Sequence, residues 1–179
     1  MPPSTAAGVM VDTLRLRLRE LCDSDAPFIL ELLTDRDFLA NVGDRGVHDL
    51  DGAHRYIREG PGASYRLNGF GLYLVERRAD AAPLGICGLL HRDSHPDVEI
   101  GFALVPRARG AGYALEAAQA TMALATGRFG LKKVVAITAP DNHASIRILE
   151  RLGLHDQGLL AWSGDERGAR LFVYGAIPL

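Results

Sequence analysis

Hydrophobic and polar residues follow different periods in different parts of the chain. Leucine alternates with arginine over residues 13–20, and this period of two is typical of a strand with one solvated face. The arginines of this strand are therefore expected in solvent rather than in a polyanion site. Apolar residues three or four apart then predict two helices, one beginning near Asp23 and one near Asp49 or Asp51. Residues 38–46, between these helices, have the composition of a loop.

Strand patterns dominate the middle and the end of the chain. Runs of β-branched and apolar residues separated by polar turns predict strands at 70–76, 84–91, 98–105, 133–139, 158–162 and 170–174. Two further helices are predicted, one over 114–126, which is almost continuously apolar or small, and one over 142–152, which Gly153 ends. Strands joined by hairpins, followed by strands joined by helices, predict an α/β fold with a mixed sheet.

Length and composition predict one soluble domain. The 179 residues are enough for a single core, and we assign residues 13–179 to it and residues 1–12 to a flexible tail. A formal net charge of −2 argues against nucleic acid as a partner. The first residues lack the pattern of a secretory signal, and no stretch is apolar enough to span a membrane, so we expect a cytoplasmic protein with no membrane partner. The two cysteines lack metal-ligand spacing, and no metal is expected.

The segment from Glu99 to Glu116 carries the strongest chemical signal. A predicted strand ends at Pro106, a loop rich in glycine and arginine follows, and a helix begins near Gly112. Glycines permit positive φ angles, and the first turn of a helix presents unpaired N–H groups at the positive end of its dipole. Such a loop is suited to a pyrophosphate, to which Arg107 and Arg109 add positive charge. The alternative interpretation is a tight turn with no ligand.

Two other phosphate-binding loops fit this segment poorly. A Walker loop requires Gly-Lys-Ser/Thr, whereas Tyr113 and Ala114 follow Gly112. A dinucleotide fingerprint would place its third glycine where Leu115 stands, and no acidic residue ends the next strand to bind a ribose. A dinucleotide-dependent oxidoreductase is therefore a weak alternative.

Two motifs resemble the GNAT acyltransferase superfamily. Residues 109–114, Arg-Gly-Ala-Gly-Tyr-Ala, are similar to its Arg/Gln-x-x-Gly-x-Gly/Ala signature, which Arg107-x-x-Gly110-x-Gly112 also satisfies. The segment from Asn142 to Leu154 resembles the Asn-x-x-Ser helix of the ribosomal-protein N-terminal acetyltransferase-like (RimJ/RimL-like) branch, with Leu154 in place of the usual phenylalanine. The resemblance covers about residues 13–176.

The resemblance implies a fold and a co-substrate. The fold would be a mixed, mostly antiparallel sheet of six to seven strands, flanked by about four helices, with an acetyl-CoA cleft between the splayed strands 98–105 and 133–139. Asn142 would contact the pantetheine arm, although it also fits a simple helix N-cap. The other residues implied to bind acetyl-CoA do so mainly through their backbone: Phe102, Ala103 and Leu104 at the acetyl-pantetheine arm, and Arg109, Gly110, Ala111, Gly112, Tyr113 and Ala114 at the pyrophosphate.

The implied activity is transfer of an acetyl group to a primary amine by direct attack in a ternary complex. Ser145 is the candidate to protonate or hydrogen-bond the leaving thiolate, or else a plain serine on a helix face. Glu99 is the candidate general base, acting through a water, or else the partner of a rim salt bridge. His91 is a second candidate base. Some relatives place a glutamate in the strand before the Asn motif, but residues 134–138 of this chain contain none. A non-catalytic acyl-CoA-binding or sensing domain is the alternative function.

The acceptor would be a small-molecule or peptide amine. The two early helices, residues 38–46 and the last hairpin are expected to shape its site. A homodimer is compatible with the sequence, which does not itself predict one. Four acidic residues in this part of the chain would attract a cationic acceptor or form a solvated acidic surface: Asp35, Asp37, Asp44 and Asp49.

Overall fold

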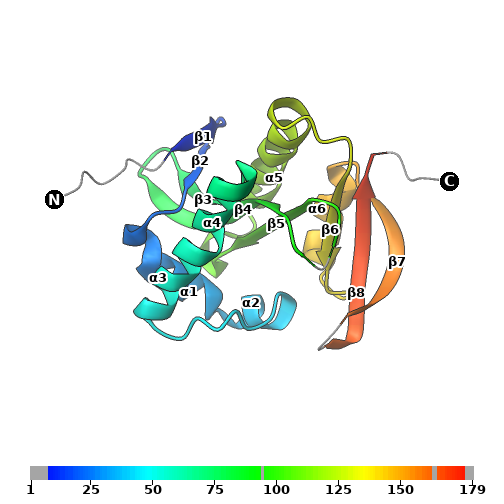
Figure 1. The fold of residues 1–179 in the computed structure, drawn as a ribbon, viewed down its shortest axis with the longest axis horizontal. Coiled ribbons are helices and arrows are strands. Elements are labelled where there is room, and N and C mark those ends of the chain that lie inside the picture. The colour runs from blue at the N-terminus through cyan, green and yellow to red at the C-terminus, as the bar shows by residue number, and fades with distance from the viewer. Residues whose placement is uncertain (1–7, 94, 163–164, 176–179) are drawn as a thin grey trace.

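The described part of the chain is organised by a single sheet of eight strands. The computed structural model describes residues 8–93, 95–162 and 165–175 (Figure 1). The strands lie in the order β1-β2-β3-β4-β5-β6-β8-β7, and only β5 and β6 are parallel. The predicted α/β fold with a mixed, mostly antiparallel sheet is confirmed. The strands are β1 (Val9–Asp12), β2 (Leu16–Glu20), β3 (Leu72–Arg77), β4 (Ala82–Leu90), β5 (Glu99–Leu104), β6 (Val134–Thr138), β7 (His155–Trp162) and β8 (Asp165–Tyr174).

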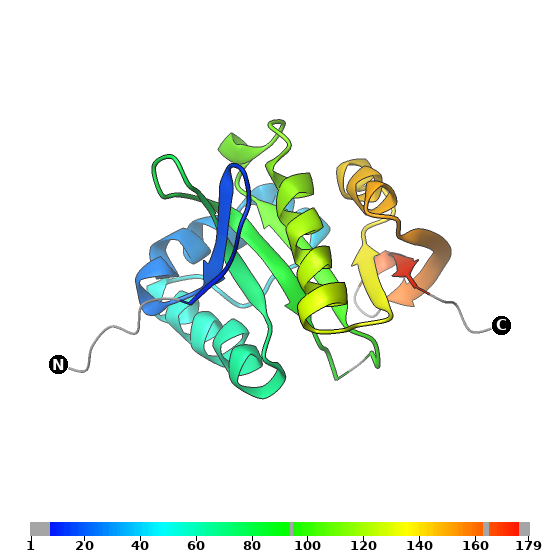
Figure 2. The same cartoon turned by 90° about the horizontal axis from the view of Figure 1, so that it is seen from above.

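Among the residues that the structure describes, six α-helices cover this sheet. In Figure 1 the helices α1, α2 and α3 lie below the strands and α5 lies above them, and Figure 2 shows α5 running across the strands as seen from above. A π-helical turn over Leu124–Arg128 extends α5. The helices are α1 (Ala26–Leu33), α2 (Arg36–Asn41), α3 (Leu50–Glu59), α4 (Pro61–Asn68), α5 (Tyr113–Ala123) and α6 (His143–Arg151).

Three elements differ from the sequence prediction. Val9–Asp12, assigned to the flexible tail, form the edge strand β1 on β2, so the tail boundary at residue 12 is wrong; residues 1–7 lie outside the described part. Helix α2 replaces part of the predicted loop because the Asp35 carboxylate caps it, accepting from the N–H groups of Asp37 and Phe38. Pro61 begins a further helix, α4, instead of only ending α3. The described residues therefore form more strands and more helices than predicted.

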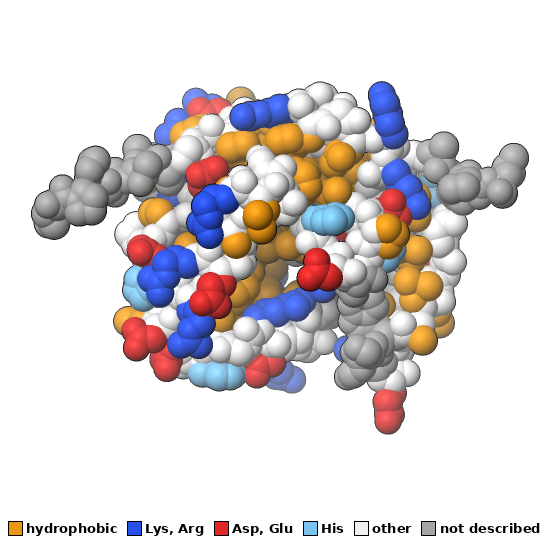
Figure 3. All heavy atoms as spheres, viewed as in Figure 1, with side chains coloured by type: hydrophobic (Ala, Val, Ile, Leu, Met, Phe, Trp, Pro, Cys, Tyr) orange, Lys and Arg blue, Asp and Glu red, His pale blue; other side chains and the backbone are white. Residues whose placement is uncertain are grey.

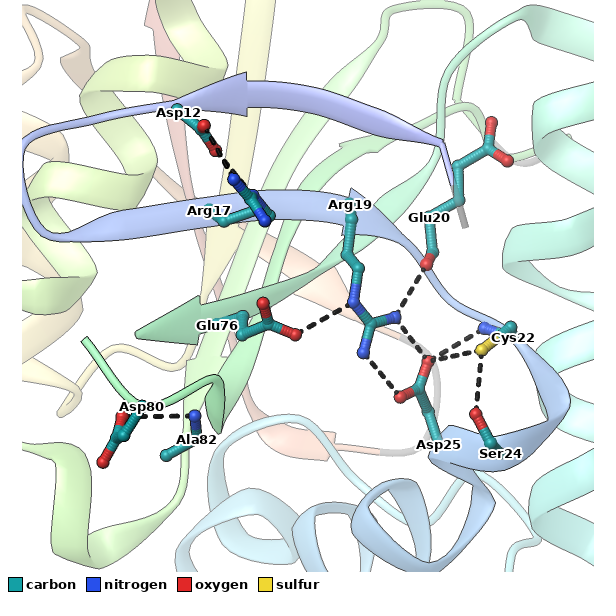
Figure 4. Close-up of polar contacts among 10 residues, drawn as sticks. All are labelled: Asp12, Arg17, Arg19, Glu20, Cys22, Ser24, Asp25, Glu76, Asp80 and Ala82. Atoms are coloured by element: carbon teal, nitrogen blue, oxygen red, sulfur yellow. Dashed lines mark hydrogen bonds and ion pairs between the residues drawn. The ribbon is translucent and has the colours of Figure 1, made fainter. Parts of the chain in front are cut away.

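The arginines of β2 form ion pairs rather than a simple solvated face. The guanidinium of Arg19, with its side chain only 18% exposed, binds both oxygens of Asp25 at 2.9 Å and lies 3.1 Å from Glu76 (Figure 4). Arg17 pairs with Asp12 of β1 at 2.8 Å. These contacts tie β2 to its neighbours and to the start of the first helical segment. The expectation of a solvated arginine face is therefore wrong for Arg19.

The strands β5 and β6 diverge immediately after they meet. Their register contains one pair, Glu99 with Val135, and the N–H of Val135 donates to the carbonyl of Val98 at 2.9 Å. On its other edge β5 pairs with β4 along its whole length. The edge of β5 beyond Glu99 therefore faces a gap, and the predicted splay of these two strands is confirmed.

The length and apolarity of the described helices do not fit a membrane span. Within residues 8–93, 95–162 and 165–175, none is both long enough and apolar enough to traverse a bilayer.

Candidate active site

A cavity of about 1010 Å³ lies where β5 and β6 diverge. Its wall includes Glu99–Ala103 from β5, Ala136–Thr138 from β6 and the side of α6 that carries Asn142, Ser145 and Leu149. Figure 3 shows a hollow in this face of the molecule, with hydrophobic side chains in its depth. Six of the candidate residues named from the sequence line this cavity: His91, Glu99, Phe102, Ala103, Asn142 and Ser145.

The predicted anion loop lies beside this cavity and does not line it. Gly110 and Gly112 have φ angles of +79° and +80°, the left-handed conformation that glycine adopts without strain. Within the described part of the chain, no group accepts a hydrogen bond from the amides of residues 110–114. These N–H groups lead into the first turn of α5, where the helix dipole favours an anion.

The arginine side chains of the loop bind carboxylates of the protein. Arg109 donates to the carbonyl of Leu104 at 3.0 Å and pairs with Asp35 at 2.9 Å and with Asp37. Arg107 pairs with Glu31 of α1. The two guanidinium groups thus join the loop to α1 and α2, and their charge is compensated there. A bound phosphate would meet main-chain N–H groups at this loop.

Arg15, in the turn just before β2, supports the loop, a role that the sequence did not suggest. Its guanidinium donates to the carbonyl of Ala111 at 2.9 Å, pairs with Glu116 of α5 at 2.7 Å and stacks over Tyr113 at 4.5 Å. Because it holds the carbonyl of Ala111 on one side, it helps to fix the orientation of the neighbouring peptide groups.

Glu99 is a buried carboxylate at the cavity wall. Only 4% of the residue is exposed, and its Oε2 lies 2.9 Å from Nε of Arg92. Burial raises the pKa of Glu99, and the charge of Arg92 offsets part of that rise. The ion pair expected as the alternative for Glu99 is therefore present, and it is compatible with a base because the carboxylate remains beside the cavity.

Asn142 and Ser145 are linked at the start of α6. The side-chain oxygen of Asn142 accepts from the N–H of Ser145 at 3.2 Å, which is the N-cap role expected as its alternative. Both residues also line the cavity. The cap fixes the first turn of α6 against the open edge of β5, and this places Ser145 opposite that edge.

Several cavity residues were missed at the sequence level. Tyr56, on the helix predicted to begin near Asp49 or Asp51, lines the cavity, and burial raises the pKa of its hydroxyl. Arg45 and Arg92 come from loops without a recognisable motif. His91, which the sequence did suggest as a second candidate base, also lines the cavity. Within the described residues, no three His, Cys, Asp or Glu side chains gather as a metal site requires.

The four acidic residues near α2 have structural partners. Asp35 caps α2, and both Asp35 and Asp37 pair with Arg109. Asp49 caps α3 by accepting from Gly52, and Asp44 lies 3.5 Å from His48. Their partners account for these carboxylates without a cationic ligand.

The sequence matches the model of the acetyltransferase (GNAT) domain over residues 15–155. The chain belongs to this family of acyltransferases, which use acetyl-CoA as the acyl donor. The chain is 32% identical over 149 residues to the uncharacterised protein YkkB of Bacillus subtilis (strain 168), covering 80% of this chain and 83% of YkkB.

Solved structures share the same fold. An acetyltransferase from Agrobacterium tumefaciens str. C58 has a TM-score of 0.78 and 26% identity, covering 93% of this chain and 94% of that one. RimL, a ribosomal L7/L12 α-N-protein acetyltransferase, has a TM-score of 0.77 at 14% identity, covering 98% of both chains. A Vibrio cholerae spermidine N-acetyltransferase in complex with CoA and spermine has a TM-score of 0.75 at 18% identity, covering 90% of this chain and 96% of that one.

Proposed function

We propose that the protein transfers the acetyl group of acetyl-CoA to the primary amine of a small molecule or a peptide. One observation carries this proposal. A single cavity joins a buried carboxylate at Glu99, the unpaired edge of β5 and the helix start that bears Ser145. A base, a polar main-chain edge and a proton donor around one cavity are the groups that amine acylation requires.

The main chain supplies most of the binding groups for acetyl-CoA. The free amides of residues 110–114 would hold the diphosphate, with the dipole of α5 behind them. The backbone of Phe102, Ala103 and Leu104 lies along the open edge of β5, where an extended pantetheine arm fits as an added strand. Asn142 would contact that arm from α6.

The side chains of the cavity divide the proton transfers between them. Acetyl-CoA supplies an acetyl thioester, whose carbonyl oxygen an N–H of β5 near Leu104 would polarise. Glu99 accepts, through a water, the proton that the amine loses as its nitrogen bonds to the acetyl carbon. Ser145 donates a proton to the sulfur when the carbon–sulfur bond breaks, and recovers one from solvent. The products are an amide and free CoA.

Thiol release in the presence of amines tests this function. The purified chain is mixed with acetyl-CoA and a panel of primary amines, and free thiol and the mass of the products are followed. We expect thiol release that depends on the amine, and products heavier by one acetyl group. Binding of acetyl-CoA without amine-dependent thiol would favour the non-catalytic sensing domain. Unchanged turnover in Ser145→Ala would remove Ser145 from the mechanism.

A further inference from the structure

Three large aliphatic side chains are exposed at the mouth of the cavity. Leu39 on α2 and Val42 just after it are each 41% exposed, and Leu67 on α4 is 83% exposed. All three line the cavity. A single exposed aliphatic residue is ordinary, but several around one opening mark a surface that a ligand covers.

The apolar surface continues from the mouth into the cavity. Phe38 lies beside Leu39 in the sequence and also lines the cavity, and deeper apolar residues come from β3, β4 and β5. Figure 3 shows hydrophobic side chains in the depth of the hollow. The deeper apolar lining residues are Leu72, Ile86, Leu90, Ile100 and Phe102. A ligand that enters past Leu67 therefore stays in contact with apolar groups until it reaches the wall that holds Glu99.

The charges of the lining do not favour a polycation. Among the described residues, three arginines and three carboxylates line the cavity, so their formal charges cancel. Arg92 pairs with Glu99 at 2.9 Å, and Arg167 lies 3.3 Å from Asp141. A site for a polyamine would need an excess of carboxylates, because each extra ammonium must lose its water. The charged lining residues are Arg45, Arg92, Arg167, Glu59, Asp93 and Glu99.

We propose that the acceptor is a primary amine attached to an apolar alkyl or aryl group, which lies against Leu39, Val42 and Leu67. This inference rests on the proposed acetyl transfer and narrows its acceptor. The amine reaches Glu99 while the apolar group covers the mouth of the cavity. The hydrophobic effect at the mouth then selects the acceptor, and no fixed counter-charge is needed.

Three amines that share one aminopropyl end test the class of acceptor. They are 3-phenylpropylamine, 3-aminopropan-1-ol and spermidine, and each is assayed by thiol release at saturating acetyl-CoA. We expect kcat/KM for 3-phenylpropylamine to exceed that of the other two by about tenfold or more, since burying part of a phenyl ring in an apolar pocket is worth that much.

Substitutions at the mouth locate the selectivity. Leu67→Ser and Leu39→Ser are each expected to lower the ratio of kcat/KM between 3-phenylpropylamine and 3-aminopropan-1-ol by about threefold to tenfold. Leu50→Ser is the matched control, because Leu50 is 48% exposed on α3 and does not line the cavity. The ratio in this control should equal that of the unmodified protein. Thermal unfolding of each variant shows that the fold is retained.

The outcomes separate this inference from the proposed function. Acetylation that prefers spermidine, or that treats the three amines alike, overturns the apolar acceptor and leaves acetyl transfer standing. A ratio that Leu67→Ser and Leu39→Ser leave unchanged also overturns it. Failure of every amine in a broad panel rejects acetyl transfer itself.

Discussion

Arg92 and Glu99 face each other across the turn between β4 and β5, with Nε and Oε2 2.9 Å apart and the carboxylate almost fully buried. Glu99 pairs with Leu90 in the antiparallel register of β4 and β5, and Arg92 lies two residues beyond Leu90. Burial favours the protonated carboxyl, and the guanidinium favours the carboxylate. The pair therefore sets the pH at which Glu99 is able to accept a proton.

Arg92→Gln should move the acidic limb of the pH profile. Burial raises the pKa of Glu99 and Arg92 lowers it again, so removing Arg92 raises it further. Activity requires the carboxylate and falls as the pH drops below this pKa, so the acidic limb in kcat/KM should shift to higher pH. Arg45 and His95 also act on Glu99 and remain in place in this variant.

Two further variants control this experiment. Arg92→Lys keeps the positive charge, so its acidic limb should lie close to that of the unmodified protein. Glu99→Gln should lose the acidic limb and about 10²-fold or more in kcat, as removal of a general base does. An unaltered acidic limb in Glu99→Gln would show that another group is the base.

Arg109→Gln should weaken acceptor binding more than CoA binding. The guanidinium of Arg109 holds Asp35 and Asp37 at the start of α2, and α2 contributes Phe38 and Leu39 to the cavity. Loss of such a partly exposed pair costs about 1 kcal/mol, so the KM of the amine should rise about fivefold. The Kd of CoA, measured by calorimetry, should change by less than about threefold because the amides stay in place.

Arg107→Gln provides the comparison for this prediction. Its partner Glu31 lies on α1 and does not line the cavity, so both constants should stay close to those of the unmodified protein. If Arg109→Gln weakened CoA binding more than about tenfold, the guanidinium and not the main chain would hold the phosphates.

Gly112→Ala should destabilise the loop. Gly112 has a φ of +80°, which costs an L-residue about 1 kcal/mol, and this loss should be seen in the free energy of unfolding by urea. Gly127→Ala is the control, because Gly127 has ordinary φ and open space around its Cα. That variant should be neutral or slightly more stable. Equal losses in both variants would contradict the strain argument.

Asp25→Asn should destabilise the protein at neutral pH by about 2 kcal/mol, since it leaves the half-buried Arg19 with one carboxylate fewer. Burial alone would raise the pKa of Asp25, but hydrogen bonds from Arg19 and Cys22 outweigh it and hold the pKa below 3.8 (Figure 4). This stabilisation is therefore present above about pH 4 and is lost as the pH falls through the lower folded pKa. Urea unfolding at pH 7 and near pH 3 should show the gap between variant and parent narrowing; a constant gap would contradict this assignment.

The sequence predicted the elements that carry strong periodic patterns. The strand before Pro106, the glycine loop and the helix begun by Asn142 follow from local spacing, because each pattern depends on residues that are neighbours in the chain. The two motifs, at residues 109–114 and 142–145, also sit on elements adjacent to β5 and β6, the strands that diverge. Asn142 and Ser145 of the second motif therefore line the same cavity as β5, with the loop of the first motif beside it, and this much of the site could be predicted.

The remaining parts depend on partners far apart in the sequence. Helix α2 is only six residues long and is held by Arg109, more than 70 positions away, so no local pattern reveals it. Arg19 follows an alternating pattern typical of solvent exposure, but Glu76 on the next strand and Asp25 enclose it. The role of Arg92 follows only from the structure, in which its guanidinium pairs with Glu99. Tertiary contacts, rather than propensity, fix these positions.

The central claim is that the amides of residues 110–114 hold the diphosphate of coenzyme A. The most direct test is the ¹H–¹⁵N spectrum of the labelled protein during titration with CoA and, separately, with S-acetylpantetheine, which has no diphosphate. The account predicts that the amide protons of Gly110, Ala111, Gly112, Tyr113 and Ala114 move downfield with CoA only, as N–H groups that bind phosphate do. Amides of β5 should respond to both ligands. Loop amides that stay in place with CoA would contradict the account.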